Sequence, residues 1–369
     1  MKNAAYLSLL MLWVWATACS NDDNPTPGNP PPPPGNPNPT WLIPTNQVRD
    51  GGVGKDGIPS IDNPTFTTDP NASDLSFLQP NDLVVGIRIG DEVRAYPHPI
   101  LDWHEIVNDN LNGTPVALTY CPLTGTAIAW DRRVNGNETE FGVSGLLYNN
   151  NLMPYDRRTN SVWSQMRLDA VNGELIGTKA TTWPIIETTW ATWKTLYPDA
   201  RVLRRPGAFS RPYGQYPYIN EFGQDYREAE WLLFPISFED DRLPRKERVL
   251  GILVGEEAKV YTFDHFPGSE LTLIADEFMG ERYVVVGSQE LNLLTAFGTT
   301  LPDGTVLELS PVQGQLPVLL EDQEGNQWDV FGVAVSGPRL GERLPKPESY
   351  IGYFFAWGTF FPIVDIYEG

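Results

Sequence analysis

The sequence predicts a mainly β protein with few short helices, built as a pseudo-symmetric pair of two similar β-rich units. Apolar and polar residues alternate over short stretches, as in VVGIRIGDEVRAYP (84–97), and a period of two is typical of half-buried strands. The 33 glycines, 34 prolines and 12 tryptophans favour compact β domains with long ordered loops. A third observation, an internal repeat, predicts that there are two such units.

The repeat extends through most of the chain. The segment VVGIRIGDEVRAYPHPIL (84–101) returns as VLGILVGEEAKVYTFDHF (249–266), and nearly the same offset aligns Gly, Tyr and Trp residues elsewhere. A constant offset over such a length predicts a tandem duplication, with a first copy at 41–210 and a second, degenerate copy at 211–369. The aligned pairs are Gly86 with Gly251, Tyr96 with Tyr261, Trp163 with Trp328 and Trp193 with Trp357.

Within the first copy, the pattern predicts strands joined by tight turns. Gly90-Asp91 and Asn135-Gly136 are typical hairpin tips, and Pro122 to Gly125 should end the strand that carries Cys121. Helical spacing is rare, and the clearest case ends before Pro198. In chain order we expect a hairpin at 84–97, a helix at 100–108, a strand run at 113–132, a hairpin at 134–145, a short strand at 161–165 and a helix at 188–197.

The N-terminal residues indicate export. Lys2 precedes an apolar stretch at 4–15 that is too short to span a bilayer, which predicts a signal peptide at 1–18. Ala16-Thr17-Ala18-Cys19 resembles a bacterial lipobox, so Cys19 is the predicted lipidated N-terminus and membrane anchor. An ordinary cleavage site with a spare thiol is the alternative. Ser20 and Asp22-Asp23 resemble the outer-membrane sorting signals of Bacteroidota lipoproteins, with the periplasmic and cell-surface faces both open.

Residues 19–40 are predicted to be a linker between this anchor and the globular part. Their sequence is dominated by proline, as in NPTPGNPPPPPGNPNPT (24–40), and cannot supply a hydrophobic core. Proline-rich chains extend as polyproline II at about 3.1 Å per residue. The linker should therefore lift the folded part away from the lipid surface.

The formal net charge of −21 argues against nucleic acid or anionic lipid as a partner, because binding phosphates requires a basic surface. An acidic surface is also how many exported proteins remain dispersed. The sequence contains no nucleotide-binding loop, serine-hydrolase elbow or zinc-protease helix signature. Several large classes of enzyme are thereby disfavoured.

Several longer motifs carry a family resemblance. RAYPHPILDWHEIVND, TYCPLTGTA, FGVSGLLYNNNLMPYDRRTNSVWSQ and VNGELIG together resemble the bacterial family filed as domain of unknown function 3179, over most of residues 50–369. Members of that family often have a second cysteine in Cys-Pro-Leu-Cys, where this sequence has Thr124. The departure weighs against a redox mechanism that needs two thiols.

Comparing the two copies indicates candidate site residues. Cys121 aligns near Val286 or Ser288, and His104 aligns near Ser269, so both are lost while the scaffold glycines and tryptophans remain. Polar groups that disappear in this way are not needed for folding, although sequence drift would give the same result. The candidate catalytic or site-lining residues are Cys121, His104, Asp156, Arg157, Ser164 and Gln165.

Cys121 and His104 are the predicted centre of the site. An unpaired thiol outside the cytoplasm is prone to oxidation, so its presence favours a role, although a buried inert cysteine is the common alternative. His104 would activate the thiolate, oriented by Glu105 or Asp109. The same pair would also be candidate ligands for copper(I) or another soft metal, with Met153 as a further candidate.

Two classes of function follow from these residues. The first is a thiolate-dependent enzyme or redox protein that uses Cys121 and His104. The alternative is a non-enzymatic binding lipoprotein that holds a metal ion or small ligand in the same cleft. The enzyme needs a thiol with a lowered pKa beside a cavity, whereas a metal site needs ligands that converge on one point.

Overall fold

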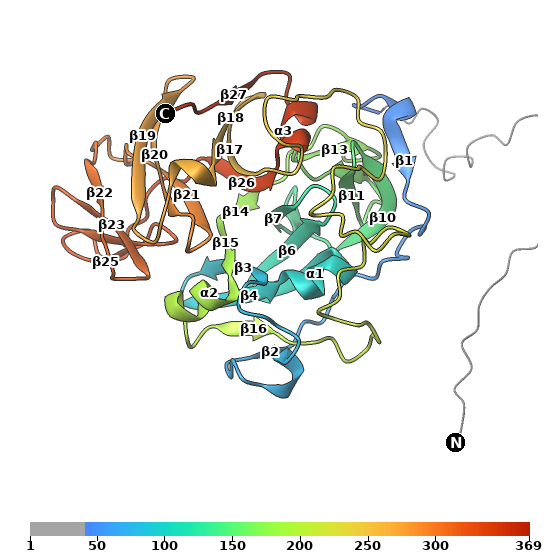
Figure 1. The fold of residues 1–369 in the computed structure, drawn as a ribbon, viewed down its shortest axis with the longest axis horizontal. Helices are drawn as coiled ribbons and strands as arrows, with labels where there is room; N and C mark the ends of the chain where they lie inside the picture. Colours follow the sequence, from blue (N-terminus) through green and yellow to red (C-terminus); the bar gives the residue numbers. More distant parts are fainter. Residues whose placement is uncertain (1–40) are drawn as a thin grey trace, which may run out of the picture. The chain divides into compact units, whose positions relative to one another are not determined.

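Strands carry most of the regular structure in residues 41–369, the part of the chain that the computed structural model describes (Figure 1). The prediction of a mainly β fold with few short helices is confirmed. The predicted signal peptide, Cys19 and the linker at 19–40 lie outside the described residues and stay predictions. The helices described are α1 (His98–His104), α2 (Trp190–Leu196), α3 (Phe354–Phe360) and the short 3-10 turns η1 (Thr45–Gln47), η2 (Ser73–Leu75) and η3 (Phe263–His265).

The first sheet has the strand order β15-β3-β4-β16-β2, and only β4 and β16 run parallel. Its centre is the predicted hairpin, which turns at Gly90-Asp91. Gly86 has no room for a side chain, because a Cβ there would lie 2.0 Å from the ring of Trp193 on α2. The strands are β2 (Phe66–Thr67), β3 (Leu83–Ile89), β4 (Glu92–Pro97), β15 (Ile185–Thr189) and β16 (Arg201–Leu203).

A second sheet, β14-β7-β6-β5, positions Cys121. As predicted, β6 ends at Cys121 and the chain turns through 122–125, so that Cys121 pairs with Thr126 at the start of β7. A third sheet, β1-β10-β11-β12-β13, and the hairpin β8–β9 complete this half. The strands are β1 (Val48–Asp50), β5 (Ile106–Leu111), β6 (Thr114–Cys121), β7 (Thr126–Asp131), β8 (Arg133–Val134), β9 (Asn137–Glu138), β10 (Phe141–Tyr148), β11 (Asn151–Asp156), β12 (Val162–Ser164), β13 (Asp169–Asn172) and β14 (Thr182–Trp183).

Residues 248–369 follow a similar plan. The sheet β26-β17-β18-β27 has the same sequence of antiparallel and parallel neighbours as β15-β3-β4-β16, and α3 precedes β27 as α2 precedes β16. A Cβ at Gly251 would lie 2.3 Å from the Trp357 ring. The strands are β17 (Arg248–Val254), β18 (Glu257–Thr262), β19 (Thr272–Phe278), β20 (Glu281–Ser288), β21 (Leu293–Gly298), β22 (Leu309–Pro311), β23 (Val318–Asp322), β24 (Gln327–Asp329), β25 (Ala334–Ser336), β26 (Glu348–Tyr353) and β27 (Val364–Ile366).

Trp163 on β12 and Trp328 on β24 have matching surroundings. In each strand the register shifts immediately before the tryptophan, as a β-bulge does. The indole N–H of Trp163 donates to Asp156 at 3.3 Å, and that of Trp328 donates to Asp322 at 2.9 Å. Both side chains are completely buried. The two bulges therefore fix two equivalent core residues.

Two of the hydrophobic cores are shared between the halves. One contains Trp163 of the first half together with Trp357 of α3, and the other contains Trp193 of α2 together with Trp328. Two further cores lie within one half each: β3 and β4 pack on α1 and β5–β7, while β17 and β18 pack on β20 and β21. Residues 40–369 accordingly fall into one compact unit.

A long irregular segment joins the halves. Residues 204–247, called the strap below, contain no helix or strand and connect the end of β16 to the start of β17. In Figure 1 the yellow-green strap runs past α1 and β11 toward α3. The boundary predicted between residues 210 and 211 falls inside it. Ordered segments of this length without regular structure are uncommon and usually functional.

The two predicted helices are shorter than expected. The first runs from 98 to 104, because Glu105 adopts a φ of 57° and Ile106 then pairs with Thr119 of β6. The β-branched residues Ile106 and Val107 favour that strand. The second covers only 190–196, because residues 188–189 belong to β15. Within residues 41–369 no helix has the length and apolar character required to cross a membrane.

Candidate functional site

Cys121 is enclosed by backbone groups of the neighbouring strand. Only 1% of its surface is exposed, and its Sγ donates to the carbonyl of Asn150 at 3.4 Å and accepts from the N–H of Leu152 at 3.3 Å. Burial, together with the charge of Glu105, raises the pKa of the thiol to about 11. The resting group is therefore a neutral thiol, which becomes a nucleophile only when a base removes its proton.

Among the described residues no hydrogen bond joins His104 to Cys121, and the predicted Cys121–His104 pair stays a prediction. The Nδ1–H of His104 donates to the carbonyl of Pro59 at 2.7 Å, and Nε2 accepts from the hydroxyl of Tyr213 at 2.7 Å. Burial lowers the pKa of His104 and keeps the ring neutral. Both imidazole nitrogens are therefore hydrogen-bonded to groups other than Cys121.

The inner face of α1 presents polar groups instead. His98 and Asp102 lie four residues apart, which places them on one side of α1, and Glu105 follows the last residue of the helix; all three are buried. The ring of His98 packs against Tyr120, the residue before Cys121, with 4.3 Å between centroids. The N–H of Tyr120 donates to the carbonyl of Glu105 at 2.7 Å. This face therefore lies against the end of β6.

Glu105 is the carboxyl group whose charge acts on Cys121. Its Oε1 accepts a hydrogen bond from the hydroxyl of Tyr218 at 3.1 Å. Burial raises the pKa of Glu105 to about 7, and the Tyr218 bond only partly opposes that effect. A carboxyl group that titrates near neutral pH can both accept and return a proton.

Asp102 is a second buried carboxyl group on the same face. Among the described residues no hydrogen bond holds its side chain. Burial raises the pKa of Asp102 well above its usual range, and the nearby charges of Asp225, Asp82 and Glu105 add to this against the opposing charge of Arg227. Burial thus favours the protonated form of Asp102, and a protonated carboxyl group can donate a hydrogen bond.

His98 connects this face to the second half of the molecule. Its Nε2 lies 3.2 Å from an oxygen of Glu187, whose other oxygen accepts from Arg248 of β17. Burial acts to raise the pKa of Glu187, but His98 and Arg248 outweigh it, and the pKa lies below its usual value. Glu187 is thus a carboxylate that holds His98 in place.

Gln165 lies in a buried polar network beside Cys121. Its Oε1 accepts from Thr126, the strand partner of Cys121, at 2.8 Å and from Asn151 at 2.8 Å. Its Nε2 donates to Thr119 at 2.9 Å. The structure therefore brings the predicted residues Cys121 and Gln165 together across one hairpin, with the amide serving to hold the hairpin to β11.

The other predicted residues lie in separate surroundings. Asp156 accepts from the backbone N–H and hydroxyl of Thr159 and from Trp163, so it organises the turn between β11 and β12. Arg157 forms ion pairs with Asp62 and Glu140, both at 2.7 Å. The hydroxyl of Ser164 is buried and has no hydrogen-bond partner among the described residues. These three residues are not gathered around Cys121.

The geometry offers little for a metal ion. Within residues 41–369 no three His, Cys, Asp or Glu side chains converge as metal ligands would. Met153, the further copper ligand considered from sequence, packs with Ile43 and Val171 in a small core of its own. The described part of the chain therefore does not supply the soft ligand set that copper(I) requires.

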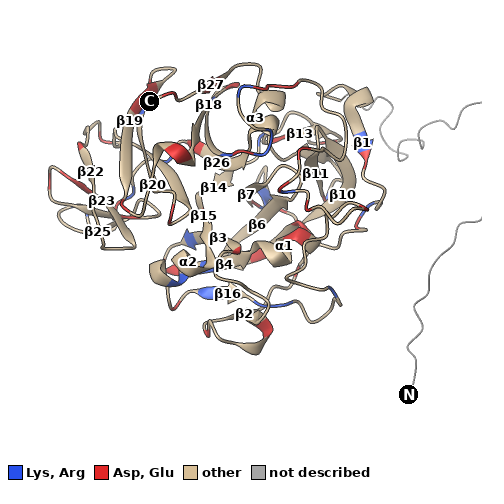
Figure 2. Cartoon of the chain, in the orientation of Figure 1, with Lys and Arg blue, Asp and Glu red and all other residues tan. Residues whose placement is uncertain are grey.

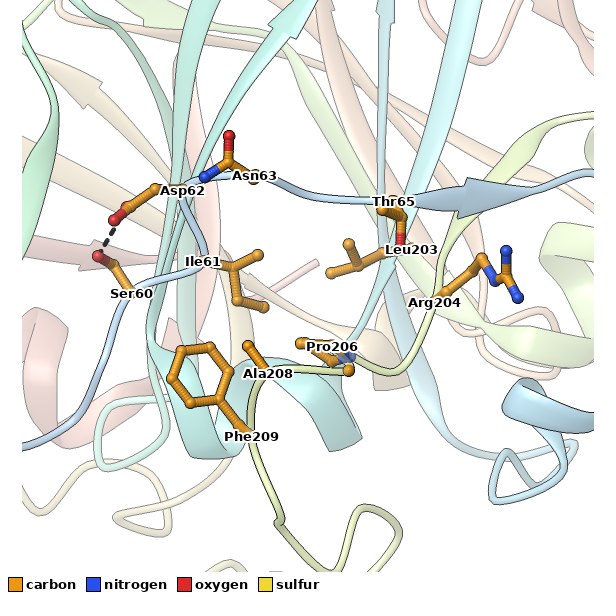
Figure 3. A pocket seen from close by; sticks show the side chains of 11 residues that line it. Ser60, Ile61, Asp62, Asn63, Thr65, Leu203, Arg204, Pro206, Ala208 and Phe209 are labelled. Carbon is orange, nitrogen blue, oxygen red and sulfur yellow. Dashed lines mark hydrogen bonds between the residues drawn. The ribbon is translucent and has the colours of Figure 1, made fainter.

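A cavity of about 220 Å³ lies between residues 60–65 and the start of the strap (Figure 3). Ile61, Leu203 and Phe209 form its apolar side, and Ser60 donates to Asp62 at its edge at 2.8 Å. The ring of His104 packs on Phe209 with 4.9 Å between centroids. Arg157 donates to Ser60 and Asp62. The predicted residues His104 and Arg157 thus support the walls of this cavity.

Several basic residues outside these sites form ion pairs with acidic neighbours. Figure 2 shows acidic and basic residues interspersed over both halves. Three arginines each pair with an aspartate two residues earlier, which is a local arrangement that orders exposed turns. These pairs are Arg133 with Asp131, Arg227 with Asp225, and Arg242 with Asp240.

Sequence reasoning missed the residues that face Cys121. The spacing of His98, Asp102 and Glu105 in HPILDWHE was visible and would have indicated one polar helix face. Tyr213, Tyr216, Tyr218 and Tyr226 of the strap follow no period, and no local pattern indicates that they reach α1 and the 122–125 turn.

Over residues 55–364 the chain matches the protein family described as "Protein of unknown function (DUF3179)". This confirms the resemblance carried by the sequence motifs. The matched range includes both halves, the inner face of α1, Cys121 and the whole strap. No curated protein and no solved structure matches the chain.

Proposed function

This chain belongs to the DUF3179 family, and from that premise we propose that it is an exported lipoprotein whose first half holds a thiol-dependent catalytic centre. Cys121 is the nucleophile and Glu105 is its general base. Asp102 is a neutral hydrogen-bond donor beside them. The observation that carries this proposal is at the end of α1, where the charge of buried Glu105 acts on the buried thiol of Cys121 and on buried Asp102, and both carboxyl groups have raised pKa values. Carboxyl groups with strongly shifted pKa values are often found at sites of proton transfer.

The chemistry that suits this centre is acyl transfer to water. Glu105 takes the proton of the thiol while Sγ attacks the carbonyl carbon of an acyl compound. As the bond from that carbon to the leaving oxygen or nitrogen breaks, Glu105 gives the proton to the leaving group, and water then hydrolyses the thioester. Cys121 is the sole cysteine among the described residues, and Thr124 replaces a second thiol, which favours this reaction over thiol–disulfide exchange.

The test is the pH dependence of Cys121 alkylation, followed by mass spectrometry of the peptide that contains it. If Glu105 is the base, the rate rises with an inflection near pH 7, because ionised Glu105 is then available to take the proton. Glu105→Gln should lose that inflection, whereas His104→Gln should keep it. Identical profiles for the wild type and Glu105→Gln would remove Glu105 from the centre.

The proposed location is the cell envelope, as an outer-membrane lipoprotein that faces the periplasm or the cell surface. It rests on the lipobox-like residues 16–19 and on the proline-rich linker at 19–40. Cys19→Ala should release the protein from the lipid anchor and change its fractionation with membranes. Protease treatment of intact cells would distinguish the two faces, because only a surface-exposed chain is cleaved.

We further propose that the two halves arose by tandem duplication. The matching order of strand neighbours, the Gly86–Trp193 and Gly251–Trp357 contacts and the equivalent bulges support this origin. A solved structure in which the first and second halves could not be superposed on these elements would argue against it. On this proposal the first half keeps the centre and the second half supports it.

A second candidate function, binding a small ligand without catalysis, is favoured by the cavity at Ile61 and Phe209. Its volume of about 220 Å³ and apolar side suit a small uncharged group. Ala208→Phe would fill the cavity and should abolish binding of a probe such as indole, measured by a shift in melting temperature. Saturable binding that survives this substitution would place the ligand elsewhere.

A further inference from the structure

The strap is the element that closes the centre from solvent. Three of its tyrosines reach groups on either side of Cys121. The hydroxyl of Tyr218 donates to Glu105 at 3.1 Å, that of Tyr226 donates to the carbonyl of Leu123 at 2.9 Å, and that of Tyr216 to the carbonyl of Pro122 at 3.4 Å. These contacts bind the outer part of the strap, residues 213–231, to the general base and to the turn that follows the nucleophile.

The outer part of the strap rests on the first half through few other polar contacts. The indole N–H of Trp103 on α1 donates to the carbonyl of Gln215 at 3.0 Å, and Tyr213 bonds to His104. Its surface also includes two exposed apolar side chains, Ile219 and Phe222, the latter 81% exposed. Tyr213, Tyr216 and Tyr226 of this segment are nevertheless buried, so lifting it also removes their rings from the cores in which they pack.

The base of the strap, residues 232–247, is held much more firmly. The side chain of Asn150 exchanges two hydrogen bonds with the backbone of Phe234, each at 2.8 Å. Thr359 of α3 donates to the carbonyl of Phe238 at 2.8 Å, and the N–H groups of Phe354 and Phe355 donate to residues 247 and 245. This base is therefore a fixed hinge point between the two halves.

Lys246 joins the fixed base to the outer part. Its ammonium group donates to three backbone carbonyls, those of Tyr226, Ala229 and Trp231, and lies 3.4 Å from the centroid of the Tyr226 ring. Three donors on three carbonyls use the full capacity of an ammonium group. Arg245 of the base adds one further bond, to the carbonyl of Glu230 at 3.1 Å, so Lys246 makes three of the side-chain bonds that fasten this part of the strap.

We propose that residues 213–231 form a hinged cover over the Cys121–Glu105 centre, fastened by Lys246, and that substrate reaches the thiol when this cover lifts. The inference rests on the proposed function for its purpose, since an acyl substrate must reach Cys121. The claim that residues 213–231 control access to Cys121 can be tested without knowing the reaction. The cover keeps the resting thiol from oxidants outside the cytoplasm.

The experiment is the alkylation of Cys121 by iodoacetamide in the full chain, with the Cys121 peptide quantified by mass spectrometry so that Cys19 does not interfere. Lys246→Met keeps the aliphatic stem and removes the donors, and the rate should rise about tenfold or more because three carbonyls lose their partner. Tyr226→Phe removes one hydroxyl, and the rate should rise about fivefold. In both variants the rate should stay constant at low urea concentrations, as local opening does.

The matched control is Lys259→Met, which removes a half-buried ammonium group in the second half that pairs with Asp276 at 2.8 Å. It should leave the alkylation rate of Cys121 unchanged. A wild-type rate in Lys246→Met would overturn the cover. So would a rate that rises steeply with urea in Lys246→Met, because labelling would then require global unfolding.

The two proposals fail in different ways. If Lys246→Met exposes the thiol but adding Glu105→Gln does not alter its pH profile, the cover stands and the proposed centre fails. If Lys246→Met does not change the rate of Cys121 alkylation, the cover fails. If Glu105→Gln, made alone in the wild-type chain, still changes the pH profile of that alkylation, the centre stands.

Discussion

The two halves each contain a hairpin whose first strand ends at a different residue. In the first half β6 ends at Cys121, a turn follows, and β7 begins at Thr126; in the second half β20 ends at Ser288 and β21 begins at Leu293. The thiol of Cys121 bonds the backbone groups of Asn150 and Leu152, whereas the hydroxyl of Ser288 donates to the carbonyl of Gly268 and secures a neighbouring loop. The thiol contributes less to its scaffold than the serine does.

The surroundings of these two positions differ further. Glu105 directly precedes β5 and is buried, whereas Glu270 shortly precedes β19 and is exposed. The strap covers the first position, and among the described residues no comparable segment covers the second. The comparison teaches that burial of ionisable groups is a local addition to a scaffold that folds without it. Burying a carboxyl group costs stability, so a buried carboxyl group at this position in the first half alone favours a functional reason.

The largest expected effect tests the shared scaffold. Trp163→Ala and Trp328→Ala should each lower the free energy of unfolding by about 3–5 kcal/mol, because both indoles are completely buried. Urea unfolding followed by fluorescence or circular dichroism measures both. A loss in one variant several times that in the other would break the equivalence of the two halves.

The next effect tests the difference at Glu105. The pKa of Glu105 is about 7 in the folded chain, whereas an exposed glutamate, as in the unfolded chain, has a pKa of 4.5. The folded state therefore favours the protonated carboxyl group. The contribution of Glu105 to the free energy of unfolding is fully present below pH 4.5. It is lost as the pH rises through 7, and the free energy of unfolding then falls by about 3 kcal/mol. Glu105→Gln should remove this fall from the unfolding free energy measured between pH 4 and 8. Glu270→Gln is the control and should leave the profile as in the wild type.

A smaller effect separates scaffold from site at Asp156. Asp156 and Asp322 both accept from backbone N–H groups and from a tryptophan indole. Asp156→Ala and Asp322→Ala should each cost about 1–3 kcal/mol of unfolding free energy, because buried donors lose their acceptor. Equal losses, with Cys121 alkylation unchanged, would assign Asp156 to the scaffold. If Cys121 alkylation is faster in Asp156→Ala but not in Asp322→Ala, Asp156 belongs to the site.

The smallest effect concerns the position equivalent to Cys121. Ser288→Ala removes the bond to Gly268 and the one accepted from Leu291, and should cost about 1 kcal/mol of unfolding free energy. Cys121→Ala loses only weak sulfur contacts and should cost no more than that. A Cys121→Ala loss well above that of Ser288→Ala would make the thiol a structural residue.

The sequence predicted local features well and contacts across the fold poorly. The end of β6 at Cys121 follows from Pro122 and Gly125, which act on their immediate neighbours. The choice between His104 and Glu105 does not follow in the same way. Both are polar and adjacent, and the residue that faces the thiol depends on the left-handed Glu105, which is fixed by pairing between β5 and β6.

The same reasoning explains the other site residues. The alignment of the two halves shows that Arg157 and Gln165 have no counterpart in the second half. It does not show that Arg157 pairs with Asp62 or that Gln165 accepts a hydrogen bond from Thr126. Such partners lie far apart in sequence and are joined only by packing. The strap tyrosines were missed for the same reason, because their contacts to residues 105, 122 and 123 span about a hundred positions.

The two shared cores have a consequence for how the chain folds. Trp163 and Trp357 belong to one core and Trp193 and Trp328 to another, so each of these cores contains residues of both halves. Contacts between residues so distant in sequence form slowly, since a long loop must close before they are gained. If the chain is exported from its N-terminus, the first half must wait, with apolar strands uncovered, until the last residues have emerged. Folding should therefore be a late, single event, and an envelope chaperone has a defined interval in which to act.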